Sequence, residues 1–509
     1  MQKDYFGRET MAFESILDLH ISSYKDELRP SFYVDFNVDQ IIDRICKNWG
    51  ENISSFYYYL PADKESEDYR REVMADVKIV SLNEVLMSFV RKMKQHQEII
   101  NKKEFVRRDI QKAAWHISEV LQYGEALQEL LGALQEADIR SQGMISLKES
   151  LEAYLASEEF KTMYQTAGEL QQERNSYRFK VKYSNNQVVV SEGEIAGTYD
   201  KFLKDNLTEP EKPMKSPFVE NADLVSLEML IIEILQKKKP KLFKNTIDFY
   251  EKYKDYAKEV YIQLGKELPY YLAFYKFEEK MQKKGFAFTA PTVDETQDMF
   301  ATGLYDLALA YVNSEEDKEV TTNDVVYHAG ETFIVLTGPN QGGKTTFARS
   351  LGQMMYFTKM GLDVPAMAAN VHYFNKILTH FTVEESVETG RGKLQEELVR
   401  LKPMMNEEGT NDFVIINELF TTAANYDAII MGQRVLQHFI GQNSKGIYVT
   451  HLKELTEAHE SVVSMRAMLD EQGKQNHKIV RKEAEDIACA INQVNKYRLK
   501  YEQLKERLS

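Results

Sequence analysis

Hydrophobic residues recur at steps of three and four over a long stretch without proline, residues 81–177. Ala113, Trp115, Ile117 and Val120 belong to this apolar set, and charged residues fill the other positions. Such spacing places apolar side chains on one face of an α-helix. The stretch therefore predicts long amphipathic helices. An antiparallel coiled coil and a plain helical bundle both fit the pattern.

A switch to period two follows. Residues 179–183 alternate between apolar and polar, an Asn-Asn pair occupies 185–186, and three valines fill 188–190. This pattern predicts a β-hairpin set between helices. A helical pattern resumes over 224–284.

The last part of the chain has a third pattern, in which short apolar runs alternate with helical segments. That alternation is typical of an α/β unit with a parallel sheet. We therefore expect a multidomain α plus α/β protein. The predicted domains are a helical core over 1–95, long lever-like helices with a small β-hairpin near 178–195 over 96–285, and an α/β domain with a C-terminal helix over 286–509.

Composition narrows the class of protein. At 509 residues the chain is too long for one hydrophobic core, and its two cysteines fit a reducing compartment. Neither a secretory signal nor a run of about 18 apolar residues is visible, so we expect a cytoplasmic protein without membrane contact. The net charge of −15 makes DNA binding less expected, although a local basic face would permit it.

The strongest chemical signal lies between a short apolar run at 333–336 and a helical segment at 346–355. The intervening "GPNQGGKT" matches G-x-x-x-x-G-K-[ST] in full. Glycines let backbone N–H groups point at phosphates, and a helix N-terminus adds positive potential. Lys344 would supply a point charge, and the Thr345 hydroxyl would bind magnesium. The predicted ATP-binding residues are Gly338, Pro339, Asn340, Gln341, Gly342, Gly343, Lys344, Thr345 and Thr346.

Two later strands carry candidate catalytic groups. Residues 414–416 predict a buried strand that leads to Glu418, and 446–451 predict another that ends in His451. A Glu in this place of a nucleotide hydrolase orients or deprotonates water. If these strands are neighbours of the first, their ends converge where ligands bind. We expect Lys344, Glu418 and His451 to be catalytic, with His451 on the γ-phosphate or the attacking water. The structural alternatives are a solvent-exposed carboxylate for Glu418 and a surface or core histidine for His451.

Asn417 is unusual because an Asp commonly assists magnesium at this strand end. An amide keeps a carbonyl acceptor but lacks the negative charge. The phosphates supply most of the coordination, so Mg²⁺ should still bind. We expect Thr345, Asn417 and Glu418 to form the metal site, with weaker metal affinity and slower turnover than an Asp would give.

In order along the chain, these motifs resemble the MutS family of mismatch-repair ATPases. The resemblance implies an ABC-type P-loop ATPase domain at 286–509 and a homodimer. In that dimer, ATP on one subunit's loop would be completed by the partner's signature segment, with Tyr426-Asp427 near the interface. The segments that carry the resemblance are "TGPNQGGKTT", "MGLDVPA" (360–366), "ETGRGKLQEEL" (388–398), "NELFTTAANYD" and "VTHLKEL".

Departures from the family pattern leave two functions open. The N-terminus has no visible Phe-x-Glu mismatch-reading segment, and Gly392-Lys393 replace the signature Ser-Thr. The first interpretation is an ATP-driven homodimeric switch that acts on structured or branched DNA without mismatch reading. The second is a nucleotide-binding scaffold with little hydrolysis that acts through protein partners. Glu418 favours the first; Asn417 and Gly392 favour the second.

Overall fold

Contacts in the computed structural model divide the chain into two compact units. Unit 1 holds residues 1–13, 80–139 and 145–266, and unit 2 holds 14–79, 140–144 and 267–509. Residues 14–79 therefore group with the C-terminal part, a grouping that the predicted division into three consecutive domains did not anticipate; that division stays a prediction. The structure describes residues 13–18, 29–50, 53–106, 108–177, 179–184, 187–192, 231–316, 318–381, 392–406, 409–470 and 474–484.

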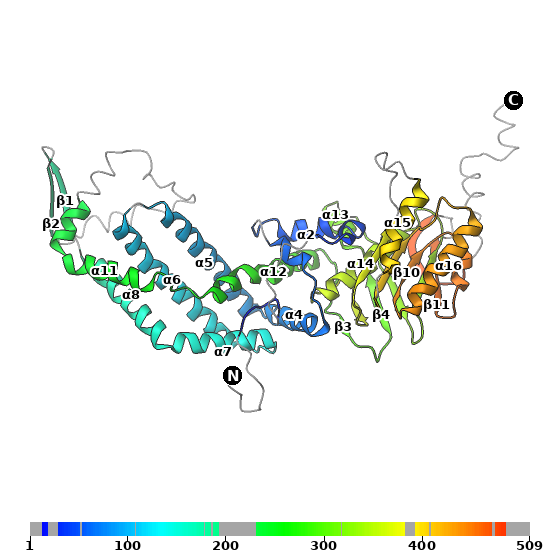
Figure 1. Ribbon diagram of the computed structural model, residues 1–509, viewed down its shortest axis with the longest axis horizontal. Coiled ribbons are helices and arrows are strands. Elements are labelled where there is room, and N and C mark those ends of the chain that lie inside the picture. Colours follow the sequence, from blue (N-terminus) through cyan, green and yellow to red (C-terminus); the bar gives the residue numbers. More distant parts are fainter. Residues whose placement is uncertain are drawn as a thin grey trace, which may run out of the picture. The chain divides into compact units, whose positions relative to one another are not determined.

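Unit 1 is a helical bundle around α6 (Asp109–Glu136). This helix packs against α5 (Val80–Glu104), α8 (Glu158–Ser176) and α11 (Pro240–Tyr253), so the bundle alternative holds (Figure 1). Ion pairs Lys92–Glu129 and Lys103–Glu119, both 2.6 Å, fix α5 and α6 as antiparallel neighbours. Ala113, Ile117 and Val120 are buried as predicted, but Trp115 is 43% exposed because it lies off their face of the helix. The other helices with residues in unit 1 are α7 (Gln142–Ala156) and α12 (Glu259–Gln282).

The predicted hairpin is present in unit 1. Strand β1 (Phe179–Ser184) pairs antiparallel with β2 (Gln187–Glu192), and Val181 faces Val190 across the pair. Its Asn-Asn turn at 185–186 lies outside the described residues, as does the predicted C-terminal helix at 495–509.

The principal sheet of unit 2 has the strand order β12-β11-β6-β10-β9-β8, and every neighbouring pair is parallel except β11 with β12. Strands β6 and β9 are buried at every residue, which explains why both appear in the sequence as unbroken apolar runs. The mixed α/β class is thus confirmed. The strands are β6 (Phe333–Thr337), β8 (Ile377–Phe381), β9 (Phe413–Asn417), β10 (Lys445–Val449), β11 (Val462–Leu469) and β12 (Gln475–Arg481).

Helices cover this sheet. Phe333, Val335, Val414 and Ile416 share a hydrophobic cluster with side chains of α15 (Lys393–Asn406) and α16 (Asn425–Gly441). Because strand side chains alternate, Ile334, Leu336 and Ile415 belong to the other face. Helix α14 (Lys344–Lys359) also contacts strands β8, β9 and β10.

A smaller sheet and short helices complete unit 2. The sheet has the order β3-β7-β4-β5. The additional elements are α1 (Phe32–Asp35), α2 (Val38–Cys46), α3 (Ser54–Tyr58), α4 (Lys64–Val77), α13 (Leu307–Glu315), the 3-10 helix η2 (Lys453–Glu457), β3 (Thr292–Val293), β4 (Met299–Leu304), β5 (Asn323–Tyr327) and β7 (Ala368–Val371). Within the described ranges, none of the helices has the length and apolarity needed to cross a bilayer.

Candidate functional site

Three adjacent parallel strands bring the candidate residues together. Strand β10 lies between β6 and β9, so their carboxyl ends meet at one edge of the sheet. Lys344, Glu418 and His451, which follow these strands, line one pocket of about 830 Å³. The expected convergence is therefore confirmed.

The loop between β6 and α14 depends on two glycines with positive φ, 135° at Gly338 and 89° at Gly343. A Cβ on Gly338 would lie 2.8 Å from the Ala467 side chain of β11, so the close approach requires glycine. Gly343 caps α14, which begins at Lys344, two residues earlier than the predicted helix. The Lys344 ammonium donates to the carbonyl oxygens of Gly338 and Pro339, both at 3.1 Å.

The predicted phosphate-binding residues fall into two groups. Gly338, Pro339 and Gly342 shape the loop, and the Gly342 N–H donates to the Pro339 carbonyl at 3.1 Å. The others line the pocket itself. These are Asn340, Gln341, Gly343, Lys344, Thr345 and Thr346.

A hydroxyl and an amide meet beside the loop. The Thr345 hydroxyl donates to Oδ1 of Asn417 at 3.1 Å, across 72 residues of sequence. Both are oxygen groups of the kind that magnesium accepts. Over the described ranges, no cluster of three or more His, Cys, Asp or Glu side chains is arranged to hold a metal. A magnesium ion here would thus take most of its ligands from phosphate oxygens and water.

Glu418 and His451 form a second polar pair. His451 Nε2 lies 3.2 Å from Glu418 Oε1, and the Glu418 N–H donates to the Val449 carbonyl at 2.9 Å. The hydrogen bond with His451 lowers the pKa of Glu418, and the charges of Lys344 and Lys393 add to this against the opposing effect of burial. Glu418 is therefore ionised at neutral pH and able to accept a proton.

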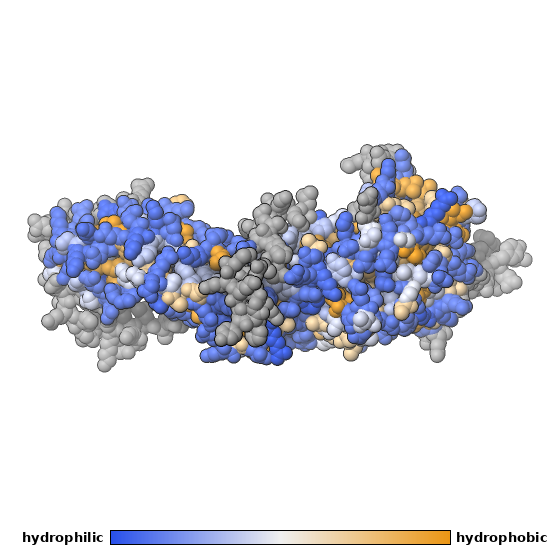
Figure 2. Space-filling model, turned by 60° about the horizontal axis from the view of Figure 1, so that its bottom comes forward, coloured by the Kyte–Doolittle hydropathy of each residue, from blue (hydrophilic) through white to orange (hydrophobic). Residues whose placement is uncertain are grey.

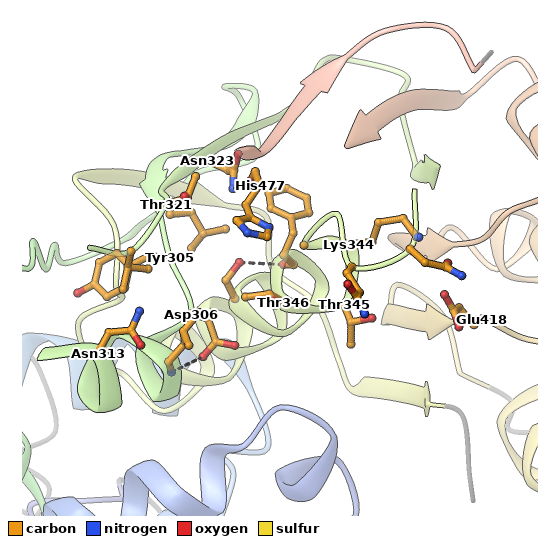
Figure 3. A pocket seen from close by; sticks show the side chains of 18 of the residues that line it. Tyr305, Asp306, Asn313, Thr321, Asn323, Lys344, Thr345, Thr346, Glu418 and His477 are labelled. Atoms are coloured by element: carbon orange, nitrogen blue, oxygen red, sulfur yellow. Dashed lines mark hydrogen bonds between the residues drawn. The ribbon is translucent and has the colours of Figure 1, made fainter. Parts of the chain in front are cut away.

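The pocket continues beyond the loop into a region that the sequence did not single out (Figure 3). His477, from β12, lies near Gly343, with Nδ1 3.4 Å from where a Cβ of that glycine would stand. Asn323 fixes this strand by donating to the His477 carbonyl at 3.2 Å and accepting from the Ile479 N–H at 2.8 Å. These partners are 154 to 156 residues apart, so no local pattern marks them. Other lining residues of this region are Tyr305, Asp306, Asn313 and Thr321.

The geometry suits a phosphorylated ligand with a polar body. A cavity of about 830 Å³ is within the range of small-molecule sites. At one end, the α14 N-terminus and Lys344 offer N–H donors and positive charge. Figure 3 shows Lys344, Thr345 and Glu418 at this end, with Tyr305 and Asn313 at the other. The residues present fit a magnesium-bound nucleoside triphosphate.

Residues 334–493 match the family model described as MutS domain V. This match covers β6, the loop, β9, β10 and their catalytic candidates. This part of the chain is therefore similar to the MutS family. The resemblance of the motifs is thus confirmed.

Similar proteins include three named for mismatch repair. The DNA mismatch repair protein MutS of Chlamydia muridarum is 25% identical over 249 residues, which are 47% of this chain and 29% of that protein. MutS of Syntrophomonas wolfei is 28% identical over 131 residues, 26% of this chain and 15% of the relative. MSH3 of Arabidopsis thaliana is 29% identical over 137 residues, 26% and 13% respectively. The matched region spans less than a third of each relative.

The start of α15 carries the altered signature. Gly392 and Lys393 line a second hollow of about 480 Å³, next to Leu394, Leu398 and Thr422. In Figure 2, apolar side chains gather over the part of unit 2 that carries α15 and α16. Residues 388–391 of the signature lie outside the described ranges. The exposed apolar residues of these helices are Leu398 (44%), Val399 (48%) and Tyr426 (73%).

Proposed function

We propose that this chain is an ATP-binding and ATP-hydrolysing conformational switch with an ABC-type P-loop ATPase domain. The observation that carries the proposal is the meeting of Lys344, the Thr345–Asn417 pair and the Glu418–His451 pair in one pocket. The first pair joins the segment after β6 to the end of β9, the second joins the ends of β9 and β10, and together they provide groups for phosphate, metal and water.

The residues have distinct roles in this proposal. Loop N–H groups and Lys344 hold the phosphates, and Thr345 and Asn417 face the magnesium side. Bound magnesium supplies charge neutralisation on the phosphates. Glu418, kept ionised, orients the attacking water and accepts its proton, while His451 holds the carboxylate and contacts the γ-phosphate or that water.

The proposed assembly is a homodimer with composite sites. The support is Leu398, which lines one hollow with Gly392-Lys393, and the exposure of the apolar residues Val399 on α15 and Tyr426 on α16. Exposed apolar surface can mark an interaction site. Lys393 would then offer a cation to the partner's phosphates in place of the family's Ser-Thr. The relatives are named as DNA mismatch repair proteins, which supports DNA as the partner, and structured or branched DNA is our proposal for this chain.

Steady-state ATP hydrolysis separates the two candidate functions. Lys344→Ala and Glu418→Gln should each lower the rate at least about 100-fold, because each removes a charged group from the reacting phosphate or water. Glu454→Gln, an exposed glutamate on η2, is the matched control and should hydrolyse as the unchanged protein does. A rate that survives both site changes overturns hydrolysis at this site. The scaffold alternative, which Asn417 favours, predicts that the unchanged protein binds nucleotide but hydrolyses little or none of it.

DNA binding has its own test. Affinity for a branched duplex should fall steeply as salt rises, because phosphate contacts release counterions. No binding at low salt would remove DNA from the proposal. The dimer is tested by the mass of the protein with and without a non-hydrolysable ATP analogue.

A further inference from the structure

The turn that carries Glu418 has an unfavourable backbone. Glu418 has φ 55° and Phe420 has φ 64°, although neither is glycine. A bulky side chain rarely adopts this left-handed conformation, and it persists only where surrounding structure holds it. Two such residues flank Leu419 directly after β9. The turn that aims Glu418 into the pocket therefore needs an external restraint.

Glu397 of α15 supplies one. Its side-chain Oε2 accepts the Phe420 N–H at 3.1 Å, across 23 residues of sequence. Glu397 is 1% exposed, and its Oε1 has no hydrogen-bond partner among the described residues. A carboxylate acceptor makes a stronger hydrogen bond than a neutral one. The contact thus fixes the backbone two residues beyond Glu418.

Burying the Glu397 carboxylate among apolar side chains costs free energy. Leu401, Leu419 and Phe420 belong to the hydrophobic cluster beneath α15 and α16. Burial raises the pKa of Glu397, and the Phe420 N–H and the Lys393 charge only partly oppose this. An apolar side chain would pack there without that cost. The carboxylate is therefore explained by the backbone it holds.

The same helix acts on Glu418 a second way. Lys393 lies four residues before Glu397, and its positive charge contributes to the lowered pKa of Glu418. The first turns of α15 thus bear on both the backbone and the charge of the strand-end glutamate. α15 begins at the altered signature.

We propose that Glu397 is a positioning residue that holds the 418–420 turn and so keeps the Glu418 carboxylate aimed at the pocket. This inference rests on the proposed function, because Glu418 is the group being positioned. The Glu397–Phe420 hydrogen bond also connects α15, which begins at the altered signature, to the turn of Glu418 within one subunit.

Three variants test the inference in the full-length chain. Glu397→Ala removes the acceptor and should lower kcat roughly 10- to 100-fold, because small misplacements of a reacting group cost about that much. Its nucleotide affinity and KM should change less than twofold. Glu397→Gln keeps a carbonyl acceptor and should recover most of the rate. Lys402→Ala, at an exposed position later on the same helix, is the control and should leave the rate unchanged.

Backbone amide exchange provides a readout besides activity. In Glu397→Ala, the peptide that contains residues 418–420 should exchange several-fold faster, while peptides of α14 keep their protection. Faster exchange together with the kcat loss supports the inference, even if thermal unfolding shows some loss of stability. Unchanged exchange overturns it, whatever the rate does.

The outcomes also separate this inference from the proposed function. If Glu418→Gln stops hydrolysis but Glu397→Ala does not slow it, positioning by Glu397 is wrong and the ATPase proposal stands. If the unchanged protein shows no hydrolysis, the ATPase proposal fails, and the catalytic part of this inference fails with it. If Glu397→Gln is as slow as Glu397→Ala, a neutral acceptor does not suffice and the charge of Glu397 is the part that matters.

Discussion

The two ends of α14 are built for opposite purposes. Its first residues, Lys344 and Thr345, line the pocket and use partners that a ligand can replace, such as the loop carbonyls. Its last turns are sealed. The Tyr356 hydroxyl lies 2.7 Å from that of Tyr33, and Lys359 forms a 2.6 Å ion pair with Glu67, both side chains 3% exposed. One helix thus connects the proposed ligand site, at its first residues, to a buried core at its last turns.

Helix-end chemistry explains the difference. The first N–H groups of a helix have no internal acceptor and attract anions, whereas the last carbonyls require donors. At the far end of α14, the Tyr270 hydroxyl donates to the Met360 carbonyl at 2.7 Å, and Leu362 N–H donates to the Phe357 carbonyl at 2.9 Å. The buried end is therefore satisfied by the protein alone. The pocket end is where we propose that phosphate binds.

The largest expected effect is at the buried end. Lys359→Ala leaves the Glu67 carboxylate buried without its cation and should cost about 3–5 kcal/mol of unfolding free energy. Replacing both partners, with Lys359→Met and Glu67→Leu, should bring stability close to that of the unchanged protein, because no charge is stranded. Urea unfolding measures both. Lys276→Ala, which breaks a more exposed pair with Glu279, is the control and should cost less than about 1 kcal/mol; an equal loss there would contradict the comparison.

Alanine substitutions at two glycines should distinguish the buried part of α14 from its pocket end. A Cβ at Gly352 would lie 2.5 Å from the buried Phe36 ring, so Gly352→Ala should lower stability by about 1–3 kcal/mol and spare nucleotide affinity. Gly343→Ala instead forces φ 89° on a residue with a Cβ, at the start of the helix. It should weaken nucleotide binding more than Gly352→Ala does. Thermal unfolding would measure the stability of each variant, and nucleotide titration would measure its affinity. Equal losses of both quantities in the two variants would contradict the difference between the two positions.

Asn417→Asp should increase the magnesium affinity of the pocket. A full negative charge beside Thr345 favours magnesium by on the order of 1 kcal/mol, so the magnesium midpoint for hydrolysis should fall about fivefold and the rate should rise. Asn313→Asp adds the same charge at the other end of the pocket and should move the midpoint less (Figure 3). If Asn417→Asp changes neither quantity, Asn417 does not face the metal.

The smallest effect concerns pH. The His451 contact is the main cause of the lowered pKa of Glu418, so the carboxylate needed for hydrolysis is lost only well below neutral pH. His451→Ala should raise that pKa toward its usual range, and the acid limb of kcat should move to higher pH. A kcat profile from about pH 4 to pH 8 measures the shift. An acid limb that stays in place would mean that Glu418 is not the titrating group.

Local sequence determined the pocket end of α14. The glycine spacing predicted the loop before Lys344, and the apolar runs predicted β6, β9 and β10 to within a residue or two, because turn geometry and burial on both sheet faces are written in neighbouring residues. The helix start was misplaced by two residues, since Lys344 and Thr345 look polar yet already have helical backbone.

Tertiary structure decided what the strands bring together. Placing β10 between β6 and β9 set Glu418 beside His451, and pairing β12 to β11 brought His477 to the loop. The Glu397–Phe420 and Lys359–Glu67 contacts likewise join residues 23 and 292 positions apart. Periodicity records which face of an element is buried, but the partner of each buried polar group follows from the order of strands and the packing of helices. The sequence therefore predicted the phosphate end of the site, and the fold decided what holds it in place.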